Sequence, residues 1–131
     1  MTVARAFAAI LGAVLTVLGL LGFIGNPVIG DATGGPLFVT GIVHDLLHLT
    51  TGALLLYIAF GMGGRPQAEA LIGVGIGYLV FVLLTLISPN LLGIFNYPVN
   101  GLDHLLHLAV GAACIGVGWF GRSTAMRADK G

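Results

Sequence analysis

Charged side chains are scarce in this sequence. Lys, Arg, Asp and Glu together make up 8% of its 131 residues, whereas an ordinary soluble domain carries roughly 25%. Because 57% of the residues are hydrophobic, so few charges cannot cover the surface of a water-soluble fold. The composition therefore excludes a soluble enzyme and a disordered chain, and it indicates an integral membrane protein.

The chain also lacks an excess of charge of either sign and has almost no cysteine. Five basic and five acidic residues give a formal net charge of zero, so nothing attracts a polyanion and we expect no nucleic-acid partner. The single cysteine, Cys114, excludes an intrachain disulfide and a metal site built on a cysteine pair. No P-loop, dinucleotide fingerprint, G-x-S-x-G or H-E-x-x-H motif occurs, so no motif points to an enzyme.

Long apolar runs occupy most of the chain. A helix needs about 20 mainly apolar residues to cross a bilayer, and four stretches meet this requirement: residues 6–24, 41–60, 71–87 and 102–120. The segments between them are short and contain Gly, Pro, Asn and Ser, which end helices. We therefore predict one transmembrane domain over residues 1–131, an all-α, up-down bundle of four helices.

The basic residues fall on one side of this predicted bundle. Arg5 precedes the first span and Arg65 lies between the second and third. The other three follow the fourth span: Arg122, Arg127 and Lys130. Because loops 25–40 and 88–101 contain no basic residue, the positive-inside rule predicts that these loops face outward and that both termini are cytoplasmic.

Glycine is abundant, at 22 residues, well above its usual share of roughly 7%. Several small residues recur four positions apart within a span: Ala8 with Gly12, Gly73 with Gly77, and Ala112 with Gly116. Such pairs let helix backbones approach closely in lipid. We interpret them first as packing within the chain, and alternatively as a face for a partner helix or a second copy.

Two of the spans carry related sequences. The pattern L-L-H-L followed by G-A occurs over residues 46–53 and again over residues 105–112. This repeat predicts two tandem helical hairpins of the same orientation, related by a pseudo-twofold axis along the membrane normal. The second and fourth spans then occupy equivalent positions and meet across the axis. The first and third spans match poorly, sharing little beyond Gly12 with Gly77.

All four histidines lie in these repeated segments, beside the only carboxylates inside the predicted spans. Residues 44–48 read H-D-L-L-H, and residues 103–107 read D-H-L-L-H. Residues three and four positions apart share a helix face, so each span presents two imidazoles and one carboxylate on one stripe. His48 and His107 lie about 9–11 Å below the outer end of their spans. Ionisable groups at this depth normally face the bundle interior and pair with one another.

A mixed set of imidazoles and carboxylates suits Zn²⁺, Fe, Mn²⁺ or Cu²⁺. The candidate metal ligands are His44, His48, Asp103 and His107. Asp45 and His104 are candidate outer partners or alternative ligands. A structural alternative needs no metal: hydrogen bonds clamp the second and fourth spans, and Asn100 with Asp103 caps the fourth helix. A haem or other pigment held by one histidine from each span, or a proton or quinone site, is a further alternative.

The sequence thus predicts a small non-enzymatic membrane protein. Its outward-facing His/Asp cluster clamps the second and fourth spans and is a candidate site for a divalent metal. The alternative is an accessory subunit of a larger membrane complex, or a homo-oligomer, that packs through its glycine-rich helix faces.

The same segments resemble those of a known family. V-H-D-L-L-H-L-T-T-G, within residues 39–52, and N-G-L-D-H-L-L-H-L-A-V-G, at residues 100–111, are similar to the second- and fourth-helix motifs of a bacterial family of small four-span membrane proteins. That family is known only as a domain of unknown function. The resemblance begins at A-R-A-F, from residue 4, and continues to the end of the fourth span.

The resemblance implies a multi-pass protein of the bacterial cytoplasmic (inner) membrane, and it implies no activity. Four residues stand at the usual His and Asp positions of the family: His44, His48, Asp103 and His107. Asp45 and His104 stand where the family commonly has Asn, so this chain adds one acid and one imidazole to the pattern.

Overall fold

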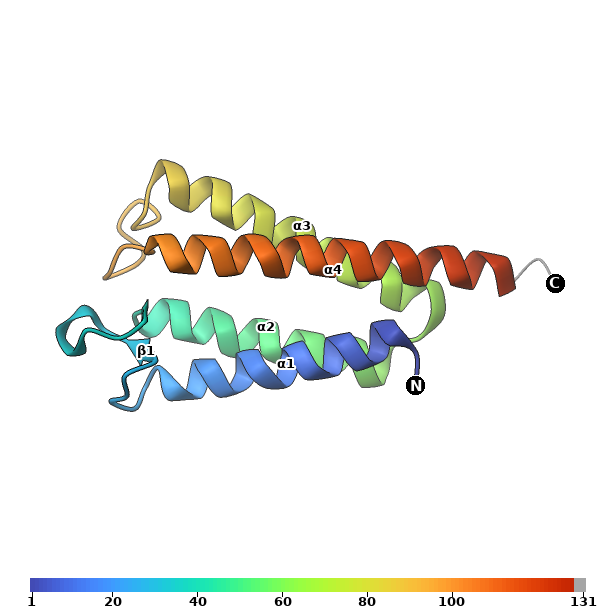
Figure 1. The fold of residues 1–131 in the computed structure, drawn as a ribbon, viewed down its shortest axis with the longest axis horizontal. Coiled ribbons are helices and arrows are strands. Elements are labelled where there is room, and N and C mark those ends of the chain that lie inside the picture. The colour runs from blue at the N-terminus through green and yellow to red at the C-terminus, as the bar shows by residue number, and fades with distance from the viewer. Residues whose placement is uncertain (129–131) are drawn as a thin grey trace.

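A computed structural model describes residues 1–128 and contains four long α-helices that form a bundle (Figure 1). The elements in chain order are α1 (Val3–Leu21), β1 (Ile29–Gly30), η1 (Ala32–Gly34), β2 (Phe38–Val39), α2 (Ile42–Gly61), α3 (Gly64–Ile87) and α4 (Gly101–Ala128). All four α-helices are long and apolar enough to cross a membrane. The predicted all-α, four-helix membrane fold is therefore confirmed.

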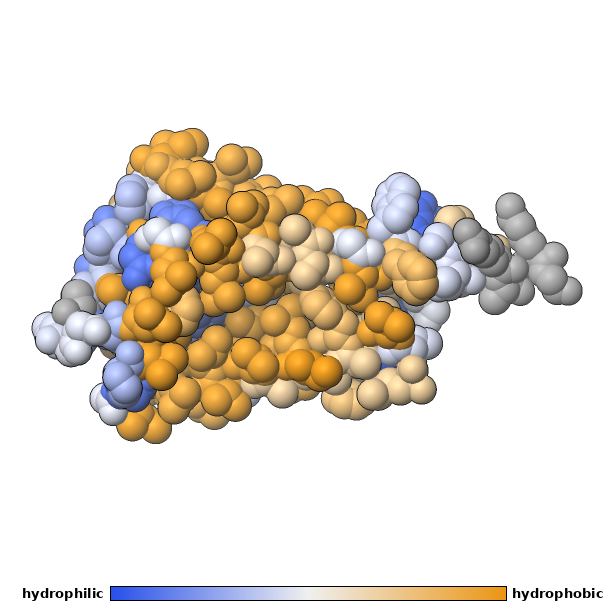
Figure 2. Space-filling model, in the orientation of Figure 1, coloured by the Kyte–Doolittle hydropathy of each residue, from blue (hydrophilic) through white to orange (hydrophobic). Residues whose placement is uncertain are grey.

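The helices alternate in direction, so α1 begins and α4 finishes at the same end of the bundle (Figure 1). We call this the terminal end, and we call the opposite end, formed by residues 22–41 and 88–100, the loop end. Figure 2 shows hydrophobic residues over the sides of the bundle and hydrophilic residues gathered toward both ends. This distribution is typical of helices whose sides face lipid.

The basic residues within the described range lie toward the terminal end of the bundle. They belong to the first turns of α1 and α3 and to the last part of α4: Arg5, Arg65, Arg122 and Arg127. Lys130, also used for the predicted orientation, lies outside the described residues.

The connection between α2 and α3 is tighter than the sequence indicated. α3 begins at Gly64 rather than at residue 71, which leaves only Met62 and Gly63 between the two helices. Pro66, expected in a linker, occupies the first turn of α3, where a missing N–H removes no intrahelical hydrogen bond. The buried amide of Gln67 donates to the carbonyl of Ile58 at 2.8 Å, so α3 satisfies a carbonyl near the end of α2.

The other helix boundaries differ less from the predicted ones. α1 covers residues 3–21 instead of 6–24, and α4 continues to residue 128 instead of stopping at 120. At the loop end, β1 and β2 form a short parallel pair that the sequence analysis did not predict. Phe95 and Val99, from the connection between α3 and α4, are buried at the loop end.

The helices pack most extensively within two hairpins, α1 with α2 and α3 with α4. Glycines face each other at both crossings: Gly12 meets Gly52, and Gly75 meets Gly111. A Cβ added to Gly52 would lie 2.8 Å from the backbone nitrogen of Thr16, so a side chain there would push the helices apart. Contacts between the two hairpins are far fewer.

The small residues of the predicted pairs fall into two groups: some pack within the chain, and others face open space. Ala8 is fully buried and Gly12 packs within the chain, as predicted. Gly73, Gly77 and Gly116 instead face open space, since an added Cβ would meet no atom within 4 Å. By its contacts, Gly75 rather than Gly77 is the counterpart of Gly12. The pseudo-twofold axis between the hairpins stays a prediction from the sequence.

We expect Gly52→Ala to lower the free energy of unfolding by about 1–3 kcal/mol, because the new methyl group overlaps the α1 backbone. Gly116→Ala is the matched control, since its methyl group meets open space and alanine favours the helix. Thermal unfolding in mild detergent, followed by circular dichroism, measures both variants. Equal stability of the two would contradict glycine packing at the first crossing.

Candidate metal centre

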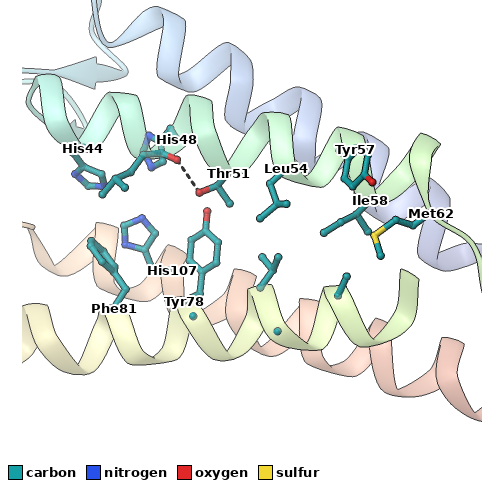
Figure 3. Close-up of a pocket in the computed structure, with 15 residues that line it drawn as sticks. His44, His48, Thr51, Leu54, Tyr57, Ile58, Met62, Tyr78, Phe81 and His107 are labelled. Atoms are coloured by element: carbon teal, nitrogen blue, oxygen red, sulfur yellow. Dashed lines mark hydrogen bonds between the residues drawn. The ribbon is translucent and has the colours of Figure 1, made fainter. Parts of the chain in front are cut away.

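Three imidazoles meet between the two hairpins, in the part of the bundle nearest the loop end. His44 and His48 lie one turn apart on α2, and His107 on α4 faces them (Figure 3). Their possible ligand atoms all lie within 4.8 Å of one another. Each residue is at most 6% exposed. We call these three residues the His cluster, and its presence agrees with the intramembrane histidine cluster predicted from the sequence.

The rings of the His cluster are in close contact. The ring centroids of His44 and His48 are 4.7 Å apart, and those of His44 and His107 are 5.4 Å apart. The centroids of His48 and His107 are 6.0 Å apart. The cluster thereby joins α2 to α4 through side chains, at a place where the backbones of these helices make little contact.

Buried nitrogens of this cluster lack hydrogen-bond partners. His44 Nε2, His48 Nδ1 and His107 Nδ1 have none among the described residues. Buried polar atoms in proteins almost always have a partner, and an unsatisfied one costs about 1–3 kcal/mol. These nitrogens belong to the same three residues that each offer one ligand atom within 4.8 Å of the others, so the cluster is a candidate site for a bound ion.

Aromatic side chains enclose the His cluster. Phe95, from the connection between α3 and α4, stacks on His44 with a centroid distance of 5.1 Å and an interplanar angle of 4°. Phe81 of α3 meets His107 edge-on at 5.1 Å, and Tyr78 lies 5.7 Å from the same ring. Helical periodicity does not identify these three residues, because it shows neither the path of a loop nor the approach of α3.

Asp103 is not part of the His cluster in the described structure. Its carboxylate accepts a hydrogen bond from the backbone N–H of Asn100 at 3.3 Å. In return, Asn100 Oδ1 accepts one from the N–H of Asp103 at 2.8 Å. This reciprocal pair caps the start of α4 and is the arrangement that the structural alternative predicted.

The two candidate outer partners also lie apart from the His cluster. Asp45 follows His44 directly and faces α1, where a Cβ on Gly22 would overlap its carboxylate. His104 Nδ1 lies 2.9 Å from the backbone oxygen of Asn100. Of the three polar residues predicted on each helix, only His44 and His48 on α2 and His107 on α4 therefore belong to the His cluster.

A groove extends from the His cluster toward the terminal end, between α2 and α3, with a volume of about 620 Å³ (Figure 3). Leu54 and Ile58 line it on α2, and Gly73, Val74 and Gly77 line it on α3. The groove lies between the two hairpins, which make few contacts with each other, and this separation is a tertiary property that no segment of the sequence encodes by itself.

Comparison with known protein families gives a match that covers most of the chain. The family described as Domain of unknown function (DUF4383) matches residues 5–120. The chain belongs to the DUF4383 family. The resemblance stated from the two histidine motifs is thus confirmed. No curated protein and no solved structure matches the chain, so the function of this DUF4383 protein has to be argued from its site.

We expect Asp103→Ala to lower the free energy of unfolding by about 0.5–2 kcal/mol, because α4 loses its cap. Asp103→Asn keeps an acceptor oxygen at the same place, so its loss of stability should be smaller. Thermal unfolding in detergent measures the stability of both. Metal binding should be unchanged in both variants, and its loss in either one would make Asp103 a ligand.

Proposed function

We propose that this DUF4383 protein is a non-enzymatic membrane protein that binds a divalent transition metal ion at His44, His48 and His107. The observation that supports this most directly is the convergence of three buried imidazoles with unpartnered nitrogens. A metal ion would occupy the place of the missing hydrogen-bond partners. Because the ligands come from α2 and α4, the ion would also clamp the two hairpins, which otherwise make few contacts.

The ligand type favours Zn²⁺, with Cu²⁺, Fe and Mn²⁺ as the other candidates. Imidazole binds all of these ions, and three histidines with one open position form a common zinc geometry. Tetrahedral zinc needs ligand nitrogens about 3.3 Å apart, given Zn–N bonds of about 2.0–2.1 Å. The ligand atoms lie within 4.8 Å of one another, so small rotations of the imidazoles would reach this geometry.

A haem or a similar pigment fits the His cluster poorly. A macrocycle ligated on both faces would have to lie between the rings of His48 and His107. The His44 ring stands beside both, with centroid distances of 4.7 and 5.4 Å. It therefore occupies space that the macrocycle would need.

The position of the site in the membrane follows from the distribution of charge. The described basic residues lie toward the terminal end, and by the positive-inside rule this supports our proposal that both termini are cytoplasmic. With the bacterial cytoplasmic membrane as its location, the His cluster lies beneath the outer surface.

An accessory subunit or a homo-oligomer is the second candidate function. Ala112 and Gly116 are four residues apart on α4 and remain exposed. An added Cβ on Gly116 would meet open space. A small-residue pair of this kind would accept a helix of a partner protein or of a second copy.

The metal proposal is tested by purifying the protein in mild detergent without chelators and measuring its metal content by mass spectrometry. We expect about one equivalent of metal, or saturable uptake of one Zn²⁺ by the metal-free protein. The bound ion should raise the melting temperature, because it binds only the folded state.

His48→Ala and His107→Ala should each abolish metal uptake and the rise in melting temperature. His104→Ala is the matched control, because this histidine lies on α4 three residues before His107 and outside the cluster. A wild-type protein that takes up none of the four metals, or a His48→Ala variant that binds as well as wild type, would overturn the proposal.

A further inference from the structure

Gly73 and Gly77 of α3 do not bring helices together, although their spacing predicts a packing pair. An added Cβ at either position would meet no atom within 4 Å. Both line the groove between α2 and α3, opposite Leu54 and Ile58. Their lack of side chains therefore widens the groove on the α3 side.

The groove runs along most of the thickness of a bilayer. Its lining on α2 extends from His44 to Met62, a distance of about 27 Å at 1.5 Å per residue. The hydrocarbon core of a bilayer is about 30 Å thick. Leu54 and Tyr57 in the lining are 47% and 63% exposed, so the groove is open along its side to the surrounding lipid. A single extended chain fits this shape better than a compact molecule.

Most polar residues of the groove lie near one end, and Tyr57, further along α2, is the exception. The His cluster lies there, and the hydroxyl of Thr51 follows one turn further along α2. The Thr51 hydroxyl donates to the carbonyl of Leu47 at 2.7 Å, and the Tyr78 hydroxyl lies beside it (Figure 3). The rest of the lining is almost entirely apolar, so the groove matches a molecule with a polar head and one hydrocarbon tail.

The lack of charged side chains among the described lining residues restricts which polar head groups the groove can bind. No Lys, Arg, Asp or Glu occurs among the described residues that line the groove. A carboxylate or phosphate head would therefore lack a charged side chain as a partner in an apolar site, which is costly. An uncharged head whose oxygens accept hydrogen bonds from imidazole N–H groups avoids this cost. A flat ring would also pack against the aromatic faces of Tyr78 and Phe81.

We propose that the groove between α2 and α3 binds one isoprenoid quinone molecule, with its ring at the His cluster and its tail along Gly73 and Gly77. The volume of about 620 Å³ is within the usual range for small-molecule sites, about 300–1,000 Å³. His44, His48 and His107 line the groove at this end, so their imidazoles supply polar contacts for the ring oxygens. Quinone binding goes beyond the metal site and does not require it, because imidazole donors remain when no ion is bound.

The test is titration of the detergent-solubilised protein with a short-chain menaquinone and with decylubiquinone, followed by native mass spectrometry. Wild-type protein should bind one quinone molecule. Gly73→Leu and Gly77→Leu place a side chain in the groove and should each weaken binding at least tenfold. Gly116→Leu is the matched control, since this glycine faces open space on α4 and does not line the groove; it should bind as wild type does.

Three results would overturn the quinone proposal: no quinone bound to wild-type protein, equal binding by the Gly73→Leu, Gly77→Leu double variant, or stronger binding of palmitate than of quinone. If the leucine variants do not fold, a photoactivatable quinone on wild-type protein decides the matter. Labels should map to groove residues such as Leu54 and Ile58, and labels elsewhere would refute the site.

The experiments distinguish a failure of the metal proposal from a failure of the quinone proposal. Metal content should be the same in Gly73→Leu, Gly77→Leu and wild-type protein, because these substitutions leave the His cluster intact. Quinone bound by a protein that takes up no metal would overturn only the metal proposal. Metal without quinone would overturn only the groove proposal.

Discussion

Direct backbone contact at glycine holds each hairpin together, and the other features of the structure depend on it. Helices surrounded by lipid gain little from the hydrophobic effect, so close packing has to supply the attraction. Gly12 against Gly52 and Gly75 against Gly111 permit that packing in α1–α2 and α3–α4. Each hairpin is stabilised by its own internal contacts, so the two hairpins make few contacts with each other. The space between them holds both the His cluster and the groove.

The space between the hairpins contains polar groups, and burying such groups in an apolar environment is energetically unfavourable. The three imidazoles of the His cluster contact one another and the aromatic rings of Phe81 and Phe95, but buried nitrogens have no partner among the described residues. Such groups in a membrane normally mark a functional site. A metal ion and the head of a lipid-soluble quinone are two ways to satisfy them, and both use the opening between the hairpins.

Helical spacing identified the members of the site only in part. Residues four apart share a face, so His44 and His48 were expected together, and they are. The same rule grouped Asp45 with them and Asp103 with His107. Asp45 turns toward α1, because Gly22 leaves room for its carboxylate there. Asp103 turns back to Asn100, because it lies in the first turn of α4 and caps the helix. Local hydrogen bonds and neighbouring helices decided which side chains joined the cluster.

The membrane setting, the four spans and the intramembrane histidines follow from the amino-acid sequence, because hydropathy, glycine and proline positions, and residue spacing act within one helix. Packing between helices fixes which histidines meet, which aromatic rings cover them, and that Gly73 and Gly77 line a groove instead of a helix crossing. These outcomes depend on the angle and separation of two hairpins. They arise from contacts between residues far apart in the chain, and no pattern within a single span specifies them.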